Sequence, residues 1–382
     1  MYILLVLGVL ILLILPFSKC NLKFYILLVA AFFSFFGFLY DPFAQLDAVK
    51  VGSGVDLVRY FNELENFRFF GADYEGYLSQ PLSRYYLLFF SQFDSNSFLP
   101  GVTAFFIYGI NLFLIYKIGQ MFHYSNSIIS VGLIVFIAFN DYFSTINLIR
   151  YPMAMTLFFL ILYWDMFCSI KITRLLYIIP ILFHPGMVLM VLVRFVSLGN
   201  VKQSIILGLG ACILFFFGFD SFFDSLISAT DSLLGTSIFA AGLQAKTLSY
   251  TTDIVYQVPL LTLFVSVFIT LILPFFTITL IGINKKWIVN NKQFIIMGCF
   301  LVGLSMFFLV TNISTGNMTT RISLAVSFLV GVLIMPIESA LVKIRNGNFT
   351  YKVFNLLLIG YIIILLAVRW GKQYVSWIAP GL

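Results

Sequence analysis

The chain has 382 residues, of which 61% are hydrophobic and only 10% carry a charge. Because soluble domains carry about 25% charged residues, this composition argues against a soluble globular domain and indicates a polytopic membrane protein. The formal net charge is +7, but Lys and Arg fall in short gaps between apolar runs, where they set membrane topology; this pattern does not suggest nucleic-acid binding.

Apolar runs recur from end to end and predict one integral membrane domain over residues 1–382, built from α-helices. The first run, "MYILLVLGVLILLILPF", has neither a basic n-region nor a small-residue cleavage site, so it predicts a retained helix rather than a signal peptide. Since a spanning helix needs about 20 apolar residues, about 10–11 transmembrane helices are expected. The ranges are 2–17, 24–40, 97–116, 126–140, 146–165, 203–219, 256–283, 293–311, 321–337 and 352–368.

Two longer segments are expected on the outer face of the membrane. Residues 41–96 are predicted to form an external loop with an interfacial helix from Gln80 to Phe93, because its tyrosines suit the headgroup zone. Residues 220–255 are interpreted as a second external loop with short helices, whose aspartates occupy a solvated face.

The apolar run 175–194 decides the topology of the second half of the chain. If it crossed the membrane once, the basic clusters that follow it would lie outside, against the positive-inside rule. A re-entrant hairpin keeps those clusters inside, and its tip falls at "HPG", where proline and glycine break the helix. The alternative is a single helix kinked at Pro185.

Three arginines fall at the external ends of predicted helices, namely Arg84, Arg150 and Arg321. With His184 at the hairpin tip they would form a ring of cations below the outer surface. Arginine presents a planar fork that matches phosphate oxygens, so the ring predicts a site for a lipid pyrophosphate. The competing interpretation is that these side chains snorkel to lipid headgroups.

Acidic residues in the first external loop supply the complementary chemistry. A carboxylate such as Asp56 can take a proton from an attacking hydroxyl, while cations stabilise a departing pyrophosphate. Together these groups indicate glycosyl transfer from a lipid-pyrophosphate sugar. Asp73 and Glu75 resemble a metal-binding acidic pair, but a solvated loop is the simpler interpretation. No cofactor or metal is predicted, and the scattered cysteines favour neither a disulfide nor a metal site.

Four features resemble the EpsG/Wzy group of bacterial polysaccharide polymerases: "GVDLVRYF", "LIRYPMAMTLFFLILYW", the short basic gap after it, and "LFHPG". The resemblance implies an architecture like that of the GT-C membrane glycosyltransferases. It implies an enzyme that joins undecaprenyl-pyrophosphate-linked oligosaccharide units at the outer face of the cytoplasmic membrane. Its partners would be that lipid-linked substrate and membrane lipids, with a chain-length regulator protein as a further candidate.

The resemblance and the charges together select the candidate site residues. Those expected to act in catalysis are Asp56, Arg150, His184 and Arg321. Those expected to contact substrate are Arg84, Tyr60, Asp73, Glu75 and Tyr151. A common family variant has Gln after the Arg and Ser after the His-Pro, so Tyr151 and Gly186 depart from it.

Two other functions fit a polytopic membrane protein with these charges. A flippase for the same lipid-linked units is the main rival, but transporters often show two related halves, and no repeat is apparent here. A membrane O-acyltransferase also uses histidine and arginine in helices, but it would need an acyl donor reached from the cytoplasm. No dedicated site for such a donor is visible in the sequence.

Overall fold

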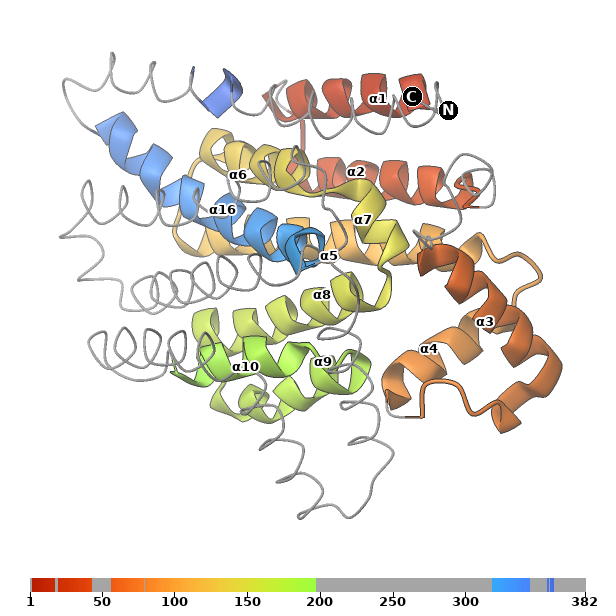
Figure 1. Cartoon of the computed structure of the whole chain (residues 1–382). Helices are drawn as coiled ribbons and strands as arrows, with labels where there is room; N and C mark the ends of the chain where they lie inside the picture. Colours follow the sequence, from red (N-terminus) through yellow and green to blue (C-terminus); the bar gives the residue numbers. More distant parts are fainter. Residues whose placement is uncertain are drawn as a thin grey trace.

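The computed structural model describes residues 2–17, 20–42, 56–78, 80–196, 318–343, 356 and 358–360. Within these ranges the chain is helical and contains no strand (Figure 1), which confirms the expected all-α class. The predicted spans 203–219, 256–283 and 293–311 and the predicted loop 220–255 lie outside the described residues, as does most of 352–368. In the described ranges one helix, α5 (Phe98–Met121), is long and apolar enough to cross a membrane.

Helix α5 lies at the centre of a bundle of helices (Figure 1). It packs against α2 (Leu22–Phe38), α6 (Asn126–Phe139) and α8 (Arg150–Leu162), and α6 packs in turn against α16 (Met318–Lys343). Helix α1 (Tyr2–Ile14) continues into a 3-10 turn at Leu15–Phe17, and together they cover the range 2–17 that was predicted for the first helix.

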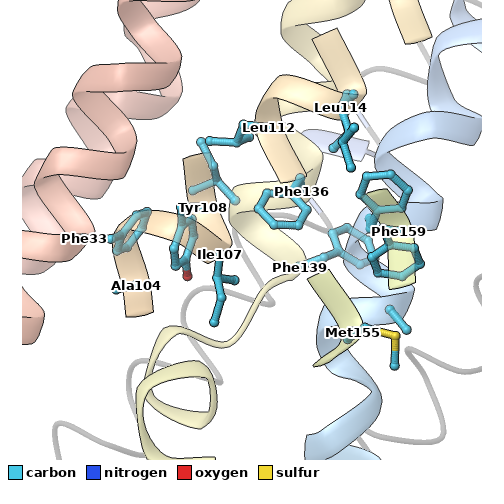
Figure 2. Close-up of a cluster of buried hydrophobic side chains, with 14 of the residues drawn as sticks. Phe33, Ala104, Ile107, Tyr108, Leu112, Leu114, Phe136, Phe139, Met155 and Phe159 are labelled. Carbon is cyan, nitrogen blue, oxygen red and sulfur yellow. The ribbon is translucent and has the colours of Figure 1, made fainter. Parts of the chain in front are cut away.

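Aromatic rings fill the interior between these helices (Figure 2). Phe33 of α2 stacks on Tyr108 of α5 with ring centroids 3.9 Å apart, and Phe159 of α8 stacks on Phe328 of α16 at 4.2 Å. Such pairs add to the stabilisation that burial of the rings provides. The high phenylalanine content therefore serves the core as well as the outer surface of the bundle.

Glycines allow the closest helix crossings. A Cβ atom added to Gly132 of α6 would lie 2.7 Å from the carbonyl oxygen of Gly331 in α16, and one added to Gly37 of α2 would lie 2.8 Å from the backbone of α5 at Gly101. Real Cβ atoms do not come so close, so both crossings require glycine. Small residues at helix contacts are typical of helices that associate within a membrane.

The segment predicted to be the first external loop contains two helices that pack together at one end of the bundle (Figure 1). Helix α4 (Pro81–Ser91) confirms the helix expected from Gln80 to Phe93. Helix α3 (Asp56–Phe70) was not predicted, because its alternation of charged and aromatic residues was interpreted as a polar loop. A 3-10 turn at Gly71–Asp73 follows α3.

The predicted helix over 146–165 is divided. A short helix α7 (Tyr142–Asn147) precedes it, with Asp141 as its N-cap, and α8 begins only at Arg150. Helix α8 ends in a π-helical turn over Tyr163–Phe167 that contains Asp165. The break before Arg150 places this residue in the first turn of α8, where the chain enters the bundle.

The chain folds back at His184–Gly186. A 3-10 segment (Lys171–Tyr177) and α9 (Ile178–Phe183) lead into the turn, and α10 (Met187–Val196) leads out of it. Arg174 Nε lies 2.9 Å from Asp165 Oδ1, and Arg194 Nη2 lies 2.6 Å from Asp165 Oδ2. Because arginines on both sides of the turn reach one carboxylate, this segment is a hairpin rather than a single kinked helix.

We expect Asp165 to make the largest single electrostatic contribution to the stability of this hairpin. Asp165→Asn leaves the guanidinium of Arg194, whose side chain is 3% exposed, buried without its anion. Breaking a buried pair in this way costs about 3–5 kcal/mol, so the melting temperature of the purified protein should fall sharply. Arg174→Ala is the control, because the Arg174 side chain is 35% exposed and should matter little. Equal melting of Asp165→Asn and the unaltered protein would contradict this role.

Candidate functional site

Arg150 is the centre of a polar cluster at the end of the bundle that carries α3 and α4. Its side chain is buried, with the residue only 4% exposed. Its Nε donates a hydrogen bond to the Tyr60 hydroxyl at 3.0 Å, and its Nη1 donates one to the Gln80 side-chain oxygen. Its Cζ lies 4.4 Å from the ring centroid of Tyr77 and 5.3 Å from that of Tyr60, within cation–π range.

All of these partners of Arg150 are neutral. In the ranges that the structure describes, no carboxylate oxygen lies within 4 Å of it, and the ion pairs found there are formed by other arginines. A guanidinium has five N–H donors, and Tyr60 and Gln80 engage one each. Buried charges are normally paired, because desolvation of an isolated ion is costly. Arg150 therefore has both the charge and the donors to receive an anion.

Three segments that are distant in the sequence hold this cluster together. The backbone N–H of Leu57 donates to the Asn147 side chain at 2.9 Å, which ties the start of α3 to the turn before Arg150. Tyr60 follows one helical turn later on the buried face of α3. Tyr77 and Gln80 belong to the turn between α3 and α4, in which Gln80 N–H donates to the Tyr77 carbonyl at 2.8 Å.

The hairpin tip brings His184 next to the residue that follows Arg150. The rings of Tyr151 and His184 meet edge to face at 5.2 Å, and the Ser83 hydroxyl of α4 donates to the Phe183 carbonyl. His184 Nδ1 accepts a hydrogen bond from the Gly186 N–H at 3.1 Å. An accepting Nδ1 places the proton of a neutral imidazole on Nε2, so the distal nitrogen of His184 is a donor.

Tyr77 is a second neutral donor beside Arg150. Burial raises the pKa of the Tyr77 hydroxyl to about 12, and the nearby guanidinium groups only partly offset that effect. The hydroxyl therefore stays protonated at neutral pH and can donate to an anion. With Arg150, it gives this cluster one fixed charge and one neutral donor.

The other predicted site residues have other partners, are exposed, or lie outside what the structure describes. Asp56 forms an ion pair with Arg59, whose Nη2 lies 2.9 Å from Asp56 Oδ1. Asp73 and Glu75 are exposed, and no group of metal-binding side chains is found among the described residues.

The predicted ring of arginines is only partly described. Arg84 donates to the backbone carbonyl of Ala72 and so ties α4 to the 3-10 turn after α3, instead of joining Arg150. Arg321 lies in α16, and its side chain is outside the described part. Of the predicted set, the structure thus brings Arg150 into contact with Tyr60, and Tyr151, the next residue on α8, into contact with His184.

Sequence reasoning missed Tyr77 and Gln80, because these neutral residues acquire a role only when α3 and α4 fold over Arg150. It also missed Arg59, although that residue lies within the quoted "GVDLVRYF" stretch. Comparison with family models, with curated protein sequences and with solved structures finds no match to this chain. The function must therefore be argued from the geometry of the site.

A stability comparison within α8 tests whether Arg150 is a structural cation. Arg150→Met removes a buried charge that has no carboxylate partner in the described ranges, and it leaves Tyr60 and Gln80 to lose one hydrogen bond each. We expect the free energy of unfolding to fall by less than about 2 kcal/mol, clearly less than for Asp165→Asn. Thermal melts of the two purified variants without ligand give the comparison. An equally large loss for Arg150→Met would mean that Arg150 serves the fold.

Proposed function

We propose that this protein is a membrane glycosyltransferase of the EpsG/Wzy polymerase type, with a polytopic, GT-C-like architecture. It would join oligosaccharide units carried on undecaprenyl pyrophosphate at the outer face of the cytoplasmic membrane. The observation that carries this proposal is Arg150, a buried guanidinium that donates only to neutral acceptors, lies against aromatic rings and has no carboxylate within 4 Å among the described residues. A diphosphate is the kind of anion that such a site fits.

The surface of the bundle supports a membrane location. Besides α5, the shorter apolar helices are Leu4–Ile14, Leu22–Phe38 and Asn126–Phe139. Large apolar side chains project outward from several of these helices, where lipid would cover them: Leu4, Ile11, Ile14, Phe24, Phe35, Phe106 and Phe113. His184 and Pro185 at the hairpin tip are buried, and broken backbone is tolerated within a membrane where protein surrounds it. These features, with a mean hydropathy of +1.05, favour a polytopic protein over a soluble one.

The site's donors suit the departure of a pyrophosphate. In the proposed reaction the acceptor oxygen forms a bond to the anomeric carbon of the donor sugar, and the bond from that carbon to the pyrophosphate oxygen breaks. The electron pair stays on the leaving undecaprenyl pyrophosphate. Arg150 would hold its phosphate oxygens, with the Tyr77 hydroxyl and His184 Nε2–H as neutral donors. Preorganised donors of this kind stabilise developing charge more than mobile water does.

The acceptor hydroxyl must lose a proton to a base. Asp56 is the candidate, since it stands one helical turn before Tyr60 on α3 and its side chain is partly exposed at 27%. A carboxylate at this position can accept a proton directly or through one water. Asp73 and Glu75 remain alternatives in the same external segment.

Polymer formation in cells should require the guanidinium of Arg150. Arg150→Lys keeps a cation but loses the planar fork, so long polymer should fall at least about tenfold while membrane abundance stays normal. Arg84→Lys is the matched control: the guanidinium of Arg84 donates to a backbone carbonyl, a role that an ammonium also fills, so its polymer should be near normal.

The same strains separate the polymerase from the rival functions. In the Arg150→Lys strain, single lipid-linked units should accumulate on the outer face of the membrane. Accumulation on the inner face would favour the flippase, and polymer of normal length that lacks acyl groups would favour the acyltransferase. Full-length polymer from Arg150→Lys at normal abundance would contradict the proposed site.

A further inference from the structure

A second guanidinium, that of Arg59, lies near the Arg150 cluster on the exposed side of α3. Arg59 Cζ lies 5.3 Å from the ring centroid of Tyr60, and Arg150 Cζ lies 5.3 Å from the same ring. The Arg59 side chain is 52% exposed, whereas Arg150 is buried. One tyrosine ring is thus approached by two cations, one fixed in the interior and one at the surface.

The two arginines differ in how firmly they are held. Arg150 is hydrogen-bonded to side chains from α3 and from the turn before α4. Arg59 is held by Asp56 at 2.9 Å, an ion pair between residues three apart on the exposed part of α3. Pairs of this kind contribute little to stability, because water screens them and ordering two long side chains costs entropy. Arg59 can therefore leave Asp56 easily.

An anion at Arg150 would give Arg59 a better partner. Like charges near one ring repel each other, and an anion that both guanidinium groups reach converts that repulsion into attraction for both. A monophosphate can be satisfied by the fixed guanidinium alone. A diphosphate carries a second phosphate, which needs a second cation.

We propose that Arg59 is a gate residue that leaves Asp56 and binds the second phosphate when a lipid diphosphate enters the site. This inference rests on the proposed function and extends it, because it makes Arg59 the residue that selects diphosphates over monophosphates. It also assigns Asp56 a resting role as the counter-ion of Arg59. The carboxylate becomes available to an acceptor hydroxyl only once the donor lipid is bound.

The test is equilibrium binding to the purified full-length protein in detergent, with farnesyl pyrophosphate and farnesyl monophosphate as probes. Arg59→Gln should bind the diphosphate about tenfold more weakly, as expected for the loss of a charged hydrogen bond. It should bind the monophosphate nearly as the unaltered protein does. Asp56→Asn releases Arg59 in advance and should bind the diphosphate about two- to fivefold more tightly.

Glu65→Gln is the matched control for Asp56→Asn. Glu65 forms an ion pair with Arg68, also three residues apart on α3, and it lies about two and a half turns further along the helix. Its substitution should leave both affinities unchanged. Damage to the fold cannot raise the affinity for the diphosphate in Asp56→Asn alone. A gain in that variant therefore shows that the Asp56–Arg59 pair controls binding, and not merely the stability of α3.

Arg150→Met separates the two proposals. Suppose that Arg150→Met no longer binds the diphosphate, while Arg59→Gln and Asp56→Asn bind it like the unaltered protein. The gate role of Arg59 is then wrong, and the proposed function stands. If Arg150→Met binds the diphosphate as tightly as the unaltered protein, or if the unaltered protein binds neither probe, the proposed anion site falls and the gate falls with it.

Discussion

Burying a guanidinium among neutral groups costs free energy, and three separate segments of this chain converge to hold one in that state. The first turn of α8 supplies Arg150, α3 supplies Tyr60, and the turn before α4 supplies Tyr77 and Gln80. A side chain that served stability alone would more economically be apolar, or paired with a carboxylate. The fold therefore maintains a local positive charge that an incoming anion can satisfy, as expected for a binding site that is formed before its ligand arrives.

Helix α8 links this charge to the rest of the site. Its first residue is Arg150, and the π-helical turn at its far end carries Asp165, which contacts arginines on both sides of the hairpin turn. The hairpin is thus fastened at its base, and its tip holds His184 against Tyr151. One helix thereby positions the cation directly and the histidine indirectly. Loss of the Asp165 contacts at the base of the hairpin would displace His184 at its tip. In the proposed site, a displacement of this kind would impair the reaction.

The apolar runs of the sequence predicted α2, α5, α6 and α16 closely, because burial and membrane contact both require long apolar helices. The helix-breaking "HPG" stretch predicted the fold-back at His184. The local sequence pattern did not predict α3, because charged residues interrupt the apolar residues that form its buried face. It also could not show that Gln80 and Tyr77 contact Arg150, since these contacts form only in the folded chain. The pattern of external arginines predicted a ring of cations that includes Arg84, and it could not show that Arg84 donates to the backbone carbonyl of Ala72. The role of Asp165 could not be predicted, because only the fold-back brings Arg174 and Arg194 to its carboxylate.

In the proposed site, a lipid diphosphate lies against the Arg150 guanidinium. Solid-state NMR of the protein in bilayers, with ¹⁵N-labelled arginine and bound undecaprenyl pyrophosphate, measures the ³¹P–¹⁵N dipolar coupling directly. We expect a phosphorus–nitrogen distance of about 4 Å, as charge-assisted hydrogen bonds require. This coupling should be lost or greatly weakened in Arg150→Met. An unchanged coupling in that variant, or none in the unaltered protein with ligand bound, would contradict it.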